Sequence, residues 1–277
     1  MISEKIELLG KGLYGKDIPD VLTLKSIPTS SELDYIGSED FNQTMLDKIL
    51  PKAVEEKINF HKLLEIDYYW ICRALRLLNY GPYHTTNAIF CSECGESSKG
   101  EYIVDLRSVG CTVLPPNFTN DIVIKKDEFI EYDKDIHVSL LTIQDAINAY
   151  KDNLFTDAEG HTNKSLARMC YMMKKAGNES LSPVTAKLIV ERDMAKCPAD
   201  SLLLQGTINE LTDYGLRATG YVECPHCHSK EAFYIALVDD RFFRPSLGAL
   251  RKWRDDRNSE RNKDNAGGKT EPVRTSN

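Results

Sequence analysis

Apolar residues recur at helical spacing in two segments of the first third of the chain. One apolar face covers residues 41–49 before Pro51, and a more regular stripe covers residues 66–78. Residues 79–81 then supply a stop signal, because asparagine and glycine readily adopt left-handed backbone. The pattern therefore predicts a short helix that begins near residue 38 and a longer helix that ends near residue 79.

From Pro82 onward, the pattern alternates between short apolar runs and helical spacing. The runs predict strands at residues 88–90, 102–106, 111–114, 122–124 and 136–141. Helical spacing returns at residues 143–150, 165–175 and 200–214, and Ser182 with Pro183 marks a further helix start. Strand-like alternation follows up to Tyr221 and again over residues 233–238.

These patterns predict an α+β fold in five regions. The regions are an extended arm (1–37), helices with a first β region (38–141), a helical insertion (142–215), a second β region (216–249) and a charged tail (250–277). Few apolar residues occur in the tail, so we expect it to be disordered in isolation. Gly10, Gly12 and Gly15 of the arm spell GxGxxG, but residues 16–19 break any following helix, which favours a flexible arm over a dinucleotide site.

The composition is that of a soluble globular protein, with 42% hydrophobic and 28% charged residues among 277. It excludes collagen, mucin-like stalks and wholesale disorder. The formal net charge is −7, and the tail from residue 250 has eight basic and five acidic residues, so the body is more acidic than the whole chain. An acidic body argues against a protein built to coat a phosphate backbone.

The sequence has no signal for secretion or membrane insertion. Residues 1–9 mix charged and apolar side chains, and no later segment approaches the roughly 20 apolar residues of a bilayer span. In a reducing compartment the eight cysteines are not expected to form a disulfide framework. Cys72 and Cys170 lie in helical patterns, where a buried thiol acts as a small apolar residue.

Four of the cysteines form two matched CxxC motifs. Strand-like apolar residues precede and follow Cys91 and Cys94, and the same is true of Cys224 and Cys227. Two residues between cysteines let one tight turn direct both thiolates at one point, and zinc takes four such ligands tetrahedrally. The sequence therefore predicts a zinc-ribbon-like module in which these four cysteines hold a structural zinc ion.

The two motifs are unusually far apart in the chain. Between them lie the 129 residues 95–223, against about 15 to 20 in compact ribbons. Closing so long a loop costs about 4 kcal/mol, whereas a structural zinc contributes roughly 10 to 16 kcal/mol in apparent binding. Metal binding therefore outweighs the entropy of loop closure.

Three other interpretations of the motifs remain open. Residues 224–227 read CPHC, a pattern of thiol oxidoreductases, although such a nucleophile needs a helix start and the following residues alternate like a strand. In a second interpretation, His226, His228 or Cys111 replaces one of the four thiols. In a third, all four cysteines are core residues, which the matched surroundings disfavour.

The sequence lacks the common catalytic signatures. It contains no phosphate-binding loop that ends in Gly-Lys-Ser or Gly-Lys-Thr, no HExxH and no GxSxG. A site closed by four thiolates also keeps no open coordination position for a substrate. We therefore expect the protein not to be an enzyme.

Residues 63–95 resemble a pattern of one known family. An apolar pair and Asp67 precede a helix that ends in Leu75 and Arg76, and a turn with Tyr80 and Gly81 leads to the first CxxC motif. This pattern resembles the baseplate hub subunit and hub assembly protein family of contractile-tailed bacteriophages of the T-even type. The likeness covers about residues 60–95 and, less closely, the second CxxC motif.

The resemblance implies a component of a phage tail baseplate, located in the virion or in the host cytoplasm during assembly. Other baseplate, hub or tail-tube proteins are the partners that it implies. From the residues alone, Asp67 and Arg76 lie at the helix ends that their charges favour. Arg73 interrupts the apolar stripe, so it either extends to the surface or meets a buried acid, which a partner can supply. Trp253 is the second candidate partner contact.

A cytoplasmic zinc-ribbon adaptor that binds nucleic acid is the alternative function. Its binding residues would be the basic segment of Arg251, Lys252, Arg254 and Arg257. The acidic body disfavours this alternative, and we expect neither a nucleic acid nor a membrane as partner.

Overall fold

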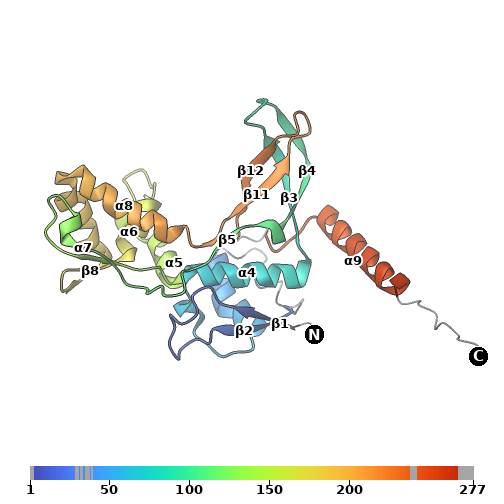
Figure 1. Ribbon diagram of the computed structural model, residues 1–277, viewed down its shortest axis with the longest axis horizontal. Coiled ribbons are helices and arrows are strands. Elements are labelled where there is room, and N and C mark those ends of the chain that lie inside the picture. Colours follow the sequence, from blue (N-terminus) through green and yellow to red (C-terminus); the bar gives the residue numbers. More distant parts are fainter. Residues whose placement is uncertain are drawn as a thin grey trace, which may run out of the picture. The chain divides into compact units, whose positions relative to one another are not determined.

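The computed structural model describes residues 3–28, 31, 34, 38, 40–237 and 242–267, with side chains up to residue 259. Helices and antiparallel sheets are both present, as the sequence predicts for an α+β fold (Figure 1). The chain divides into two units. Unit 1 contains residues 1–75 and 110–217, and unit 2 contains residues 76–109 and 218–277.

The N-terminal segment of unit 1 is a β-hairpin. Strand β1 (Ser3–Glu7) pairs antiparallel with β2 (Val21–Lys25). Leu22 and Leu24 are fully buried and alternate with more exposed residues, which gives β2 the period of a strand with one covered face. The expectation of a flexible arm over residues 1–37 is therefore wrong for the hairpin, because strands of five residues are too short to give a clear periodicity.

A helical segment follows at residues 41–53. It consists of α2 (Phe41–Thr44), one wider turn (Met45–Ile49) and α3 (Leu50–Ala53). Pro51 does not interrupt this segment, because it occupies the first turn of α3, where a missing backbone N–H leaves no hydrogen bond unmade. The predicted end before Pro51 is thus too early.

The rest of unit 1 combines two antiparallel sheets with four helices. A four-stranded sheet has the order β6 (Ile122–Ile124), β7 (Ile136–Val138), β8 (Met173–Ala176) and β9 (Glu179–Ser180), and β5 (Cys111–Thr112) pairs with β10 (Gly215–Leu216). The helices are α5 (Ile143–Lys151), α6 (Lys164–Met172), α7 (Pro183–Leu188) and α8 (Pro198–Thr212). Buried residues of the larger sheet and of the helices form one hydrophobic core.

Strand β8 corrects two expectations. The pattern over residues 165–175 predicts one helix, but α6 ends at Met172 and the chain then pairs with β7. Met173 and Ala176 are buried on the sheet, so tertiary pairing outweighs the local helical pattern. Because β8 extends a sheet that begins at β6, the predicted boundary at residue 142 divides one sheet, and residues 142–215 are not a purely helical insertion.

Helix α4 (Glu65–Tyr80) is the long helix that the apolar stripe predicts. Its first eleven residues belong to unit 1 and its last five to unit 2. The buried stripe includes Ile71 and Leu75. Among the described residues, no helix combines the length and the apolar character that crossing a bilayer requires.

In the part of the chain that the structure describes, unit 2 contains two β-hairpins, the end of α4 and a further helix. Strand β3 (Tyr83–Phe90) pairs with β4 (Ser97–Asp105), and β11 (Thr219–Glu223) pairs with β12 (Lys230–Tyr234). Helix α9 (Leu247–Gly267) follows. The expectation that the tail from residue 250 is disordered is wrong up to residue 267, and residues 268–277 lie outside the described part of the chain.

Candidate metal centre

The four predicted cysteine ligands lie at the ends of the two hairpins of unit 2. Cys91 and Cys94 belong to the turn between β3 and β4, and Cys224 and Cys227 to the turn between β11 and β12. We call residues 91–96 the first knuckle and residues 224–229 the second. Each knuckle connects two antiparallel strands, as the strand patterns around the CxxC motifs predict.

The two knuckles have the same backbone hydrogen bonds. In each, the first cysteine donates its N–H to the carbonyl oxygen five residues ahead, at 3.0 Å for Cys91 and 2.8 Å for Cys224. The residue after the second cysteine donates back to the carbonyl of the first, at 2.9 Å from both Gly95 and His228. Both residues have positive φ, 71° and 61°. Glycine adopts this conformation without strain, whereas histidine does so at a cost.

Backbone amides also face the sulfur atoms of the buried cysteines. The Cys94 N–H lies 3.5 Å from the Cys91 Sγ, and the His226 N–H lies 3.4 Å from the Cys224 Sγ. Such amides stabilise the negative charge of a thiolate. These two amides are therefore placed to stabilise the thiolate forms of Cys91 and Cys224 when a metal ion binds.

The knuckles bring all four thiols together. The Cys91 and Cys227 Sγ atoms lie 3.5 Å apart, and those of Cys94 and Cys224 lie 3.9 Å apart. All four Sγ atoms lie within 4.8 Å of one another, and none of the four cysteines is in a disulfide. Cys91 and Cys224 are buried and their knuckle partners are exposed. Four thiols in this arrangement can hold one metal ion.

Three polar residues that the sequence analysis missed surround the thiols. Glu231 is buried, and its Oε1 accepts hydrogen bonds from the Cys91 thiol at 3.1 Å and the Ser229 hydroxyl at 2.9 Å. Its Oε2 accepts from the Ser92 hydroxyl at 3.1 Å. The Ser229 Oγ lies 3.2 Å from the sulfur atoms of both Cys91 and Cys227. The burial pattern of β12 places Glu231 on its inner face, but the sequence alone does not show that this face meets the first knuckle.

The neighbours of the thiols shift several pKa values. Hydrogen bonds from the Ser229 hydroxyl and backbone lower the pKa of Cys227 to about 6. At Cys94 a hydrogen bond to the Glu96 backbone opposes burial and the neighbouring thiols, and their net effect raises the pKa to about 12. The Cys91 thiol, with Ser92 and Ser229, lowers the pKa of Glu231 to about 2. In the metal-free protein, these neighbours therefore favour the ionised forms of Cys227 and Glu231 and the neutral form of Cys94.

The alternative ligands lie outside the thiol cluster. Among the described residues, the metal-binding group around these thiols contains the four cysteines and neither histidine of the second knuckle. His228 Nδ1 instead lies 2.6 Å from a carboxylate oxygen of Glu223 on the exposed side of the knuckle. Cys111 lies in β5 of unit 1. The CPHC segment is followed by the strand β12, which does not provide the helix start that an oxidoreductase nucleophile requires.

The five residues of the family motif have structural contacts inside the fold. Asp67 is fully buried, and its carboxylate accepts hydrogen bonds from the N–H groups of Leu9 and Gly10 and from the Tyr14 hydroxyl. A Cβ atom on Gly10 would lie 2.7 Å from that carboxylate, which explains one glycine of the GxGxxG segment.

The other motif residues lie where α4 ends. Arg76 is fully buried and donates to the carbonyl oxygens of Gly81, Tyr83 and Phe242 at 2.5–2.6 Å. Its guanidinium also lies 5.7 Å from the centre of the Tyr80 ring. Leu75 is fully buried. These contacts give the motif a role in folding.

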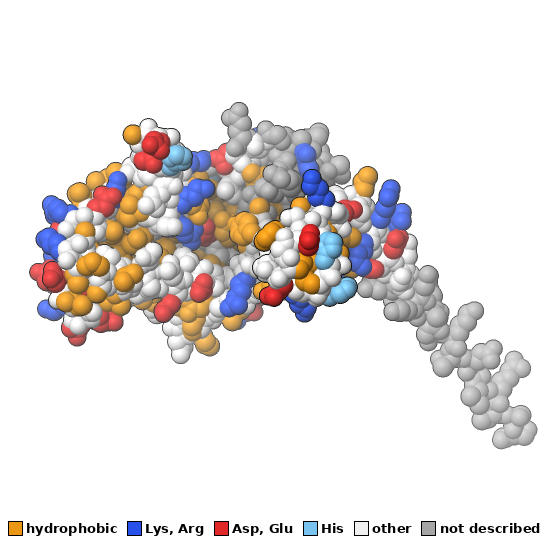
Figure 2. Space-filling view, turned by 90° about the horizontal axis from the view of Figure 1, so that it is seen from above, with side chains coloured by type: hydrophobic (Ala, Val, Ile, Leu, Met, Phe, Trp, Pro, Cys, Tyr) orange, Lys and Arg blue, Asp and Glu red, His pale blue; other side chains and the backbone are white. Residues whose placement is uncertain are grey.

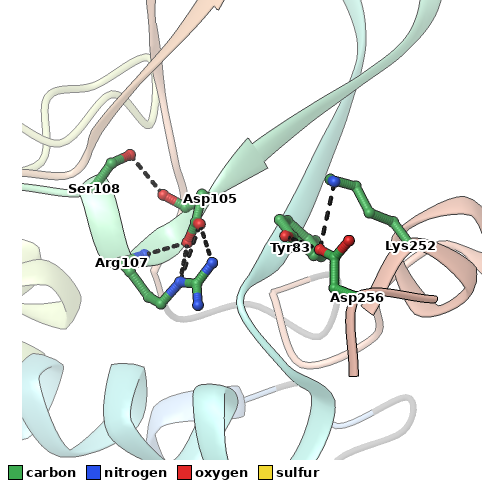
Figure 3. Close-up of polar contacts among 6 residues, drawn as sticks. All are labelled: Tyr83, Asp105, Arg107, Ser108, Lys252 and Asp256. Atoms are coloured by element: carbon green, nitrogen blue, oxygen red, sulfur yellow. Dashed lines mark hydrogen bonds and ion pairs between the residues drawn. The ribbon is translucent and has the colours of Figure 1, made fainter. Parts of the chain in front are cut away.

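The two candidate partner contacts have neighbours within their own units. The Arg73 guanidinium lies 5.0 Å from the centre of the Trp70 ring. Trp253 of α9 covers Gly81 so closely that a Cβ atom there would lie 2.4–2.6 Å from the indole ring. Around it, the Tyr83 hydroxyl donates to Asp256, and Lys252 pairs with the same carboxylate (Figure 3). Trp253 thus packs α9 against the turn that follows α4.

Comparisons of the chain with protein-family models, curated proteins and solved structures found no match. The likeness to phage baseplate proteins therefore stays a prediction that depends on the motif residues alone.

Proposed function

We propose that the protein is a structural or assembly component of a contractile-tail baseplate, in its hub region, and that a structural zinc ion holds unit 2 together. The observation that carries the proposal is the convergence of four thiols from two knuckles. Zinc supplies a cross-link between two stretches of chain that only tertiary structure brings together.

The sulfur spacing fits zinc. A zinc–sulfur distance of about 2.3 Å gives a tetrahedron with sulfur–sulfur edges of about 3.8 Å. Two sulfur pairs have distances of 3.5 and 3.9 Å, and the remaining pairs lie within 4.8 Å. Sulfur ligands in a tetrahedral set favour zinc over the hard cations calcium and magnesium, which take oxygen ligands.

The ligand set argues for a structural role rather than a catalytic one. Four protein ligands fill a tetrahedral zinc, so no position is left for water or a substrate. A catalytic zinc keeps one open position and a nearby general base. We therefore propose no hydrolytic activity at this centre.

The family motif supports the baseplate assignment indirectly. Asp67 holds the N-terminal hairpin loop, Arg76 holds the chain after α4, and Gly81 makes room for Trp253. The motif residues therefore have structural roles in this chain, which fits a structural protein.

Protein partners fit the charge distribution better than nucleic acid. Unit 1 has 21 basic and 29 acidic residues, and unit 2 has 14 and 13. Of the basic residues proposed for the nucleic-acid alternative, Lys252 pairs with Asp256, Arg254 pairs with Asp255, and Arg257 lies over the Trp253 ring. Basic and acidic side chains are also interspersed over the face in Figure 2. This charge distribution does not favour the attraction of phosphate groups.

Co-purification tests the baseplate assignment. The tagged full-length chain is co-expressed with hub and tail-tube proteins from the same genome and analysed by size-exclusion chromatography. We expect a stable complex, and a variant with Cys91→Ser and Cys224→Ser should lose it, because the hairpins are no longer held together. Elution of the zinc-loaded protein alone, beside an assembled hub, would contradict the assignment.

A further inference from the structure

Glu231 is a buried carboxylate that joins the two hairpins of unit 2. It lies on β12 opposite Val222, on the inner face of its hairpin. Its Oε2 accepts from Ser92 and its Oε1 from Cys91, which both belong to the first knuckle. Ser92 and Glu231 are 139 residues apart in the chain. The carboxylate is thus a link between the knuckles that consists of protein atoms alone.

Burying the Glu231 carboxylate costs free energy of desolvation, which burying an apolar side chain does not. Val222, its cross-strand partner, fills the same inner face without a polar group. A buried carboxylate is retained at low cost only if hydrogen-bond donors surround it, and here Ser92, Ser229 and the Cys91 thiol supply them. Packing alone therefore does not account for a glutamate at this point.

We propose that Glu231, bonded to Ser92 and Ser229, is a clamp that holds the two knuckles together before a metal ion binds and so raises the affinity of the thiols for the ion. Two knuckles on separate hairpins lose conformational freedom when they converge. A link that brings them together beforehand lowers this cost at the moment of binding. Outer-shell partners of this kind typically change metal affinity about 10- to 100-fold when they are removed.

Metal binding affects the hydrogen bonds of Glu231 differently: it preserves the bond from Ser92 and removes the bond from the Cys91 thiol. The Ser92–Glu231 hydrogen bond involves no ligand atom, so it persists when the thiols lose their protons. The Cys91 thiol can no longer donate to Glu231 once it is a thiolate. The Ser229 hydroxyl lies 3.2 Å from the sulfur atoms of Cys91 and Cys227 and is placed to donate to a thiolate instead.

The inference rests on the metal centre of the proposed function but not on the baseplate role. The test is the zinc affinity of the full chain, measured by competition with a chromophoric chelator and with Zn²⁺ as the only added metal. We expect Glu231→Ala to raise the zinc dissociation constant about 10- to 100-fold. Glu231→Gln should recover most of the affinity, because an amide oxygen still accepts from Ser92.

The matched control is Glu223→Ala, which removes a carboxylate from the same hairpin whose partner is the exposed His228. It should leave the zinc dissociation constant within about threefold of the wild-type value. Ser92→Ala should weaken zinc binding in the same direction as Glu231→Ala, and the double variant should be no weaker than Glu231→Ala alone. Additive effects of the two changes would show that the residues act separately and would overturn the clamp.

A measurement without metal separates the clamp from a general loss of structure. In the metal-free protein, the thiol oxidant diamide takes two electrons and two protons from two neighbouring thiols and leaves a disulfide. The 3.5 Å spacing of the Cys91 and Cys227 sulfur atoms favours a disulfide between the knuckles, which mass spectrometry locates. We expect Glu231→Ala to slow its formation about tenfold, with thermal unfolding of unit 1 unchanged.

The outcomes separate the two proposals. If the wild-type protein binds no zinc, the metal centre itself is refuted. If the wild-type protein binds zinc and Glu231→Ala binds it within about threefold as tightly, the centre stands and the clamp is refuted.

Discussion

Arg76 shows how one buried charge fixes the backbone around it. Its side chain is fully buried, and its three donor nitrogens reach the carbonyl oxygens of Gly81, Tyr83 and Phe242. These oxygens belong to segments on both sides of the long central part of the sequence. Arginine suits this role because its planar guanidinium offers several donors in a fixed geometry.

Replacing Arg76 by methionine should destabilise the protein strongly. Methionine keeps the length of the side chain but removes every donor, which leaves three carbonyl oxygens without these bonds. Hydrogen bonds to charged groups are worth about 1.5–3 kcal/mol each, so we expect the free energy of unfolding to fall by roughly 3 kcal/mol or more. Urea denaturation measures this change.

The control for this prediction is Arg192→Met. Arg192 is 72% exposed and pairs with the adjacent Asp193. Its replacement should change the free energy of unfolding by no more than about 0.5 kcal/mol. Similar losses in the two variants would contradict the structural role of Arg76.

The sequence predicts that Asp67 and Arg76 lie on one helix but not what they bind. Asp67 lies in the first turn of α4, as the dipole argument favours, but Arg76 lies before the last turn, which contains no basic residue. Their actual partners include backbone groups of Leu9, Gly10 and Phe242, which are 57 to 166 residues away. A local rule about helix ends contains no information on such distant partners, so only tertiary structure identifies them.

Among the elements, α9 depends on one tryptophan. Trp253 packs against Gly81, and the close approach leaves no room for a side chain at that position. Gly81 also has φ of 74°, a conformation that L-residues with a side chain rarely adopt. An isolated polar helix is marginal in water, so we expect docking at Gly81 to stabilise the first turns of α9.

Gly81→Ala should therefore release α9. The added Cβ meets the indole ring, and we expect trypsin to cleave after Arg251 and Lys252 about tenfold faster than in the wild-type protein, because local opening is more frequent. Trp253→Ala should have the same effect. Limited proteolysis with mass spectrometry of the fragments measures the rates.

Gly160→Ala is the matched control, because Gly160 also has positive φ, at 86°, but a Cβ atom there would meet no heavy atom of the described residues within 4 Å. It should leave cleavage in α9 unchanged. If all three variants cleave at the wild-type rate, docking through Trp253 is not what holds α9.

The sequence predicts secondary structure well where a periodic pattern covers many residues. It predicts poorly where a tertiary contact determines the local structure. The stripe of α4 is present as predicted, and strands flank both CxxC motifs, although β12 covers Lys230–Tyr234 and not residues 233–238. Strand β8 and helix α9 escape prediction for opposite reasons. Residues 173–176 continue a helical pattern but pair with β7, and residues 250–267 have little apolar content but dock through Trp253.

For the whole molecule, the thiol cluster is the feature that sequence alone locates best. The two-residue spacing within each CxxC motif fixes a local turn, and the repeated strand pattern identifies the two turns as a pair. Both arguments need no knowledge of the 129 residues between the motifs. The pattern does not identify Ser229 and Glu231 as part of the centre, because their role emerges only when the two knuckles face each other.

The thiol cluster also connects the two chain segments that form unit 2. Residues 76–109 and 218–277 belong to this unit, and each contributes one knuckle. A loop of this length costs about 4 kcal/mol to close, and zinc bound by four thiolates offsets this several times over. Removing the metal with a chelator should therefore loosen the two hairpins while unit 1, which has its own core, stays folded.

The most direct test of the account is the metal content of the purified full-length protein together with X-ray absorption at the zinc edge. We predict about one zinc per chain, with four sulfur atoms at about 2.3 Å from the metal. A protein purified under reducing conditions without any bound metal, or a zinc whose shell contains nitrogen or oxygen in place of sulfur, would contradict it.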